Sequence, residues 1–112
     1  MTRLLQVSDP HFGTEQAPVV DALVRLAQTT KPEVLLLSGD ITQRATRAQF
    51  DAARAFVQRL HVPNVLAVPG NHDIPLWDLS LRLRRPYARY HAAFGPVLEP
   101  SLETDALLLL AV

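Results

Sequence analysis

Three short apolar runs, each closed by a polar cluster, most constrain how this 112-residue chain can fold. The runs occupy residues 4–8, 34–38 and 65–69. A step of 31 residues separates Asp9 from Asp40, and the same step separates Asp40 from Asn71. A unit of that size fits a strand, a helix and a second strand. The chain is therefore predicted to be an α/β protein whose strands pair in parallel.

The segments between the runs have helical patterns. Residues 14–28 place apolar side chains on one face, with Pro18 in the opening turn. Thr46 and Gln49 form a capping-box pattern at the start of the next helix. Four further expectations concern the rest of the chain. They are an irregular segment at 74–85, a helix at 86–94 that ends at a glycine, a loop at 96–103 and a fourth strand at 106–112.

Composition narrows the class of protein. The formal net charge is zero, so no overall field attracts nucleic acid or an anionic membrane. Cysteine is absent, which excludes disulfides and thiolate zinc sites and fits the cytoplasm, where we expect the protein. Neither a signal peptide nor a membrane span is predicted. The apolar end at 107–112 leads us to expect one incomplete domain over 1–112, truncated at its C-terminus and prone to self-association.

Polar side chains follow all three strand-like runs. Ligands of open α/β sheets bind at the carboxyl ends of the strands, so these side chains are expected to meet there. Asp9 and His11 are two residues apart, and an extended chain would point both the same way. The two oxygens of Asp40 suit a bridge between two metals about 4 Å apart. Asn71 offers an amide oxygen to the second metal.

Two neighbours complete the third cluster. His72 follows Asn71 and can point elsewhere. Asp73 can hold the His72 ring by a hydrogen bond, or it can simply close a turn. The plainer alternative for all three clusters is turn and capping chemistry, because Asp and Asn favour strand ends.

The ordered motifs resemble those of the calcineurin-like metallophosphoesterase family. The family pattern is Asp-x-His, then Gly-Asp, then Gly-Asn-His-Asp or Gly-Asn-His-Glu, each after a strand. Here it stands as Asp9-Pro10-His11, Gly39-Asp40 and Gly70-Asn71-His72-Asp73. The flanking residues are similar to a bacterial branch near cyclic-nucleotide phosphodiesterases. The resemblance covers residues 4–75 and implies the N-terminal half of an α/β/β/α sandwich, a mostly parallel sheet with flanking helices.

The resemblance also implies an activity and a cofactor. The activity is hydrolysis of phosphoric esters, with a small phosphodiester favoured over a monoester. The cofactor is a pair of divalent ions, which can be manganese, iron, zinc, cobalt or nickel. Asp9 and His11 would bind the first ion, Asp40 would bridge and Asn71 would bind the second. His72, assisted by Asp73, would protonate or stabilise the leaving oxygen.

One departure from the family pattern leaves an alternative open. The family takes three further histidine ligands from later in the chain, two of them in a Gly-His-x-His element. After His72 this sequence has only His91, which we interpret as a helix-surface residue. The site is incomplete as written, so the chain can instead be a non-catalytic metal-binding or partner-binding fragment.

A basic and aromatic segment supports a further alternative, a nuclease-like member of the family. Such patches can hold a nucleic-acid backbone, although a charge run is more often a solvated face. We favour the solvated face, and we also favour a solvated loop over a phosphate contact for Arg44. The patch consists of Arg82, Arg84, Arg85 and Arg89 with Tyr87 and Tyr90.

Overall fold

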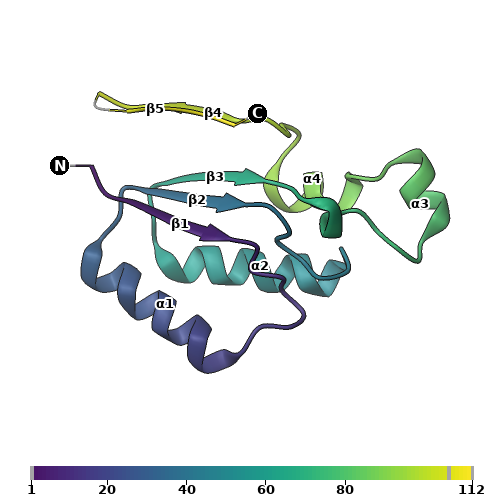
Figure 1. The fold of residues 1–112 in the computed structure, drawn as a ribbon, viewed down its shortest axis with the longest axis horizontal. Coiled ribbons are helices and arrows are strands. Elements are labelled where there is room, and N and C mark those ends of the chain that lie inside the picture. The colour runs from purple at the N-terminus through teal and green to yellow at the C-terminus, as the bar shows by residue number, and fades with distance from the viewer. Residues whose placement is uncertain (1, 106, 112) are drawn as a thin grey trace.

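The computed structural model describes residues 2–105 and 107–111. Its centre is a parallel sheet of β1 (Leu4–Ser8), β2 (Val34–Ser38) and β3 (Asn64–Val68), in that order across the sheet. Helices α1 (Ala17–Thr30) and α2 (Arg47–Leu60) connect successive strands (Figure 1). The predicted α/β class and parallel pairing are confirmed.

Both long helices cover the same face of the sheet (Figure 1). Leu35 and Leu37 of β2 are fully buried and belong to the apolar core beneath that face. Val24 of α1 and Phe56 of α2 belong to the same core. The two helices therefore fix the strands in register, and the carboxyl ends of all three strands lie along one edge (Figure 1).

The first residues of α1 and α2 have the sequence features that favour helix starts, although the capping box of α2 is incomplete. Helix α1 begins at Ala17 rather than at Thr14, and Pro18 lies in its first turn, where a missing amide costs nothing. Helix α2 is capped as predicted, because the Thr46 side chain accepts a hydrogen bond from the Gln49 amide at 3.2 Å. The capping box is only half formed, since the Gln49 side chain accepts from the Arg44 amide instead.

Two short helical elements follow β3, and the second of them lies within the segment expected to be irregular. A single 3₁₀ turn, η1 (Asn71–Asp73), follows β3, and helix α3 (Leu79–Arg84) lies further along. The Asp78 side chain caps α3 by accepting from the Leu81 amide at 3.1 Å, so the expectation for 74–85 is wrong over α3. Helix α4 (Ala88–Phe94) then begins two residues later than predicted.

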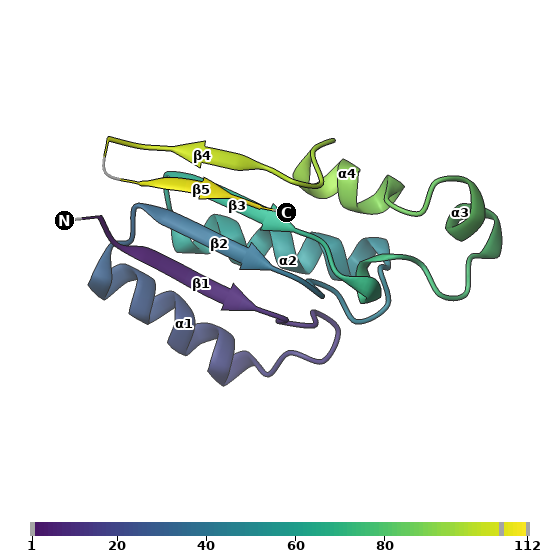
Figure 2. The same ribbon diagram turned by 45° about the horizontal axis from the view of Figure 1, so that its top comes forward.

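The last described residues form a hairpin. Strands β4 (Ser101–Glu103) and β5 (Leu108–Leu110) pair antiparallel, so the predicted loop is wrong over β4 and the predicted strand is confirmed over β5. The ends of that predicted strand, Ala106 and Val112, lie outside the described residues. A short connection cannot form a parallel crossover, which explains the antiparallel pairing. The hairpin lies over the face of the sheet opposite α1 and α2 (Figure 1, Figure 2).

Helix α4 is attached to the sheet through Tyr90. Its side chain is fully buried, and its hydroxyl donates a hydrogen bond to the Ala67 carbonyl of β3 at 2.9 Å. Burial raises the pKa of Tyr90, and the negative charge of Asp73 raises it further, so the phenol stays protonated and keeps donating. No helix among the described residues is both long and apolar enough to cross a membrane.

Candidate metal centre

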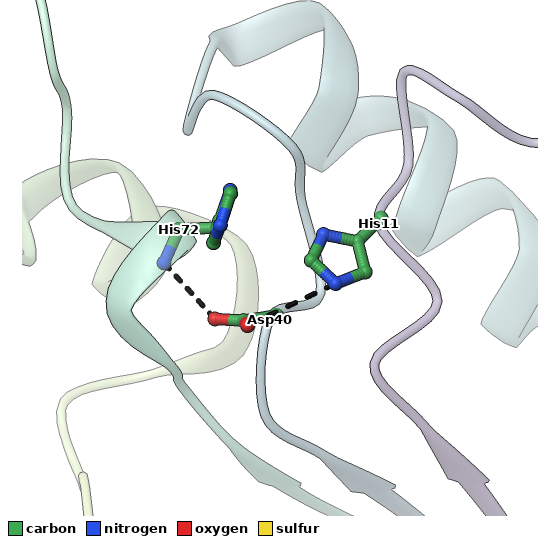
Figure 3. Close-up of side chains that lie close together, drawn as sticks. All are labelled: His11, Asp40 and His72. Carbon is green, nitrogen blue, oxygen red and sulfur yellow. Dashed lines mark hydrogen bonds and ion pairs between the residues drawn. The ribbon is translucent and has the colours of Figure 1, made fainter.

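Three side chains from three different loops meet at the carboxyl edge of the sheet. His11 follows β1, Asp40 follows β2 and His72 lies in η1 after β3. One potential ligand atom from each of them lies within 4.8 Å of the other two (Figure 3). The predicted convergence of polar groups from separate strand ends therefore holds for these three residues.

The loops after β1 and β2 are joined by backbone hydrogen bonds beyond the strands. The Asp9 amide donates to Ser38 O at 3.0 Å, and the His11 amide donates to Asp40 O at 3.0 Å. The Phe12 amide also donates to Ile41 O, at 2.8 Å. These bonds hold His11 beside Asp40 without any help from the side chains.

That pairing requires an uncommon backbone. Asp9, His11 and Asp40 have φ values of 50°, 48° and 36°, in the left-handed region. The expectation of an extended chain at Asp9 and His11 is therefore wrong. Asp and His tolerate this region better than most residues, yet each such residue costs on the order of 1 kcal/mol. Strain gathered at one edge of the sheet is typical of a functional site.

The gap between His11 and Asp40 fits a shared cation. His11 Nε2 lies 3.8 Å from Asp40 Oδ2, which is too long for a hydrogen bond. Two atoms at that separation can both reach one ion at about 2.1 Å each. Imidazole nitrogen and carboxylate oxygen are also ligands that manganese, iron and zinc accept. The donor set therefore fits a divalent metal.

His72 is oriented by two contacts. Its backbone amide donates to Asp40 Oδ1 at 3.0 Å, and its ring Nδ1 lies 2.8 Å from the Gln43 carbonyl oxygen. A carbonyl can only accept, so Nδ1 carries a proton and Nε2 is left to accept or to bind. Its ring stands edge-on to the His11 ring, with centroids 4.9 Å apart.

Asp73 is the clearest correction to the predicted site. Its carboxylate is fully buried and accepts from the amides of Ile41, Thr42 and Gly70 at 3.0, 2.7 and 2.8 Å. The Thr42 hydroxyl adds a fourth bond at 2.9 Å. The expectation that Asp73 holds the His72 ring is therefore wrong, because Gln43 does so. The alternative of turn closure is right, and Asp73 also joins the loops after β2 and β3.

The other two predicted ligands lie beside the three-residue group. Asp9 accepts from the Ser8 hydroxyl at 2.6 Å, and a Cβ added at Gly39 would lie 3.1 Å from Asp9 Oδ1. Asn71 is exposed and lines a cavity of about 220 Å³ with His72. Asp9 is not part of the three-residue group, and Asn71 lies next to His72 at the cavity. Their role as ligands stays a prediction.

The basic and aromatic patch does not form one surface. Tyr90 is fully buried, and Arg89 pairs with Asp78 at 3.4 Å. Arg82 turns toward the Pro75 carbonyl and lines the same cavity as His72. His91 packs against Tyr87 and Tyr90 on α4 and is not part of the three-residue group. The patch therefore gives no support to the nuclease-like alternative.

Comparison with known proteins agrees with this geometry. The sequence profile of the calcineurin-like phosphoesterases matches residues 2–109. The chain belongs to the calcineurin-like phosphoesterase family. Its fold, a parallel sheet flanked by helices, is that of a fragment of this family's phosphoesterase domain. Family membership explains why carboxylate and imidazole groups meet at the carboxyl edge of the sheet.

One relative carries a more specific name. A protein of Synechococcus sp., named as a probable cyclic nucleotide phosphodiesterase, is 30% identical over 81 residues. The match covers 64% of this chain and 31% of that protein. The chain therefore spans about a third of the length of this relative.

Proposed function

We propose that this chain forms part of a metal-dependent hydrolase of phosphoric esters, with phosphodiesters favoured over monoesters. The observation that carries the proposal is the meeting of His11, Asp40 and His72 from three separate loops. A packed core would not leave two imidazoles and a carboxylate within 4.8 Å of one another at the edge of a sheet. The name of the Synechococcus relative supports a diester substrate.

In this proposal four residues hold two divalent ions. Asp9 and His11 would hold the first, Asp40 would contribute to both and Asn71 would hold the second. When bound, such ions lower the pKa of water and neutralise charge on a phosphoryl group. His11 has a buried Nδ1 for which the described residues offer no hydrogen-bond partner, so its ring is held by packing and by its backbone.

His72 is the proposed proton donor. The Gln43 carbonyl fixes the proton on Nδ1, so a protonated ring presents its second proton on Nε2. That proton is available to the oxygen of a departing alcohol. Asp73 has no place in this step, because its carboxylate is already saturated by four donors from the protein.

Metal affinity tests the proposal. Calorimetric titration of the chain with Mn²⁺ should show binding that His11→Ala and Asp40→Ala each weaken by at least about tenfold, because each variant removes a ligand. His61→Asn is the matched control, since His61 ends α2 with a φ of 52° that asparagine also tolerates. Equal Mn²⁺ affinity in all variants would contradict the proposal.

The incomplete ligand set supports a second candidate, a metal-binding fragment without catalysis of its own. Among the His, Asp and Glu residues that the structure describes, three gather closely enough to share an ion, and the match covers 31% of the Synechococcus protein. Hydrolysis of bis-p-nitrophenyl phosphate with added Mn²⁺ separates the two candidates. Turnover that Asp40→Ala abolishes supports the hydrolase, whereas Mn²⁺ binding without turnover supports the fragment.

A further inference from the structure

The cavity beside His72 is lined by two arginines, Arg44 and Arg82. Its polar lining comes from Gln43, Arg44, Asn71, His72 and Arg82, and no carboxylate of the described residues lines it. Neither arginine takes part in an ion pair with any described residue. Two guanidinium groups around one cavity repel each other unless an anion lies between them.

Most hydrogen-bond donors of the two arginines remain available. Arg44 donates to the Gln43 carbonyl and Arg82 to the Pro75 carbonyl, each at 3.2 Å. A guanidinium has five N–H donors in a planar fork, and that fork matches the oxygens of a phosphate. The cavity therefore presents several unused donors next to the proposed metal centre.

Helix α3, which carries Arg82, is held in place by contacts of Asp78, the residue that precedes it. Asp78, which caps α3, pairs with Arg89 of α4 at 3.4 Å. Arg89 also donates to the Ala45 carbonyl at 3.2 Å, which links α3 and α4 to the loop after β2. Helix α3 lies beyond the carboxyl ends of the strands (Figure 1). Arg82 thus reaches the cavity from an element that the metal cluster does not use.

The cavity also has an apolar wall. Ile74 and Leu76 line it together with the polar residues, and Leu76 is 41% exposed. An inorganic ion alone would leave this wall in water. The lining therefore fits a ligand that carries both a negative charge and an apolar group.

We propose that this cavity is the substrate subsite of the metal centre and that Arg82, with Arg44, binds the phosphoryl oxygens of a phosphoric ester whose organic group packs on Ile74 and Leu76. This inference rests on the proposed function. It makes Arg82 a substrate-binding residue, where the sequence had placed it in a surface patch. Neighbouring Arg84, on the same helix, does not line the cavity.

Binding of phenyl phosphate to the metal-free chain tests the inference. The backbone amide NMR signals of Gln43 and His72 should shift in a saturable manner, and Arg82→Ala should weaken binding by about fivefold. Arg82→Lys should recover part of the affinity, and Arg84→Ala should leave it within about twofold. Leu76→Asn should weaken phenyl phosphate but not inorganic phosphate.

The outcomes separate this inference from the proposed function. Unchanged affinity in Arg82→Ala, an equal loss in Arg84→Ala, or no saturable shift in the unmodified chain would each overturn the inference. Because the titration contains no metal, none of these results depends on Mn²⁺ binding. Arg82-dependent binding in a chain that fails to bind Mn²⁺ would support the anion site and remove the proposed hydrolysis.

Discussion

Replacing Asp73 with asparagine is expected to lower the free energy of unfolding by about 3 kcal/mol, because a buried, charge-assisted network loses its acceptor. The carboxylate accepts four hydrogen bonds, three from backbone amides and one from the Thr42 hydroxyl. An asparagine side chain has one acceptor oxygen, and its amino group would face a buried N–H. Urea unfolding of the variant and the unmodified chain measures the difference.

A matched control separates this effect from the loss of a charge. Asp51 is exposed on α2, so Asp51→Asn should change the free energy of unfolding by less than about 0.5 kcal/mol. Equal stability of the two variants would show that Asp73 does not join the loops after β2 and β3. Since Ile41 and Thr42 follow Asp40 directly, Asp73→Asn should weaken Mn²⁺ binding as well.

Replacing Gly70 with alanine is expected to displace the loop that carries Asp40. A Cβ at this position would lie 2.2 Å from Asp40 Oδ1 and 2.4 Å from the Asp40 backbone nitrogen. The second of these atoms cannot rotate away, so the loop must move. We expect a loss of about 2 kcal/mol in the free energy of unfolding and of at least about tenfold in Mn²⁺ affinity.

Gly95→Ala provides the comparison for this variant. Gly95 has a φ of 93°, but no atom of the described residues, apart from Gly95 and its chain neighbours, lies within 4 Å of an added Cβ. Its replacement should cost about 1 kcal/mol through backbone strain and leave Mn²⁺ affinity unchanged. Full Mn²⁺ affinity in Gly70→Ala would show that the position of Asp40 does not matter for metal binding.

The sequence predicted the elements that depend on local patterns. Apolar runs such as residues 34–37 predict buried strands, and the Thr46 cap predicts the start of α2. The hidden helix α3 also had a local signal, since Asp78 precedes a run of helix-forming residues and caps it. Pro75 and Trp77, just before it, had favoured an irregular segment instead.

The errors arose where distant contacts override local preference. Pro10 disfavours helical angles at Asp9, yet bonds from the first loop to Ser38 and Asp40 hold Asp9 and His11 in the left-handed region. Asp73 follows His72 in sequence, but its partners come from the loop after β2. A motif gives residue types and spacing, whereas these partners depend on how the strands pair.

The central claim is that side chains from separate loops surround a bound cation, with His11 as one of its ligands and His72 beside it. Paramagnetic broadening of histidine ring signals by substoichiometric Mn²⁺ tests it directly, with each ring assigned by a His→Asn variant. We predict that the signals of His11 and His72 broaden together, whereas that of His61, at the C-terminal end of α2, stays sharp. Broadening of His61 to the same extent, or of neither His11 nor His72, would contradict the account.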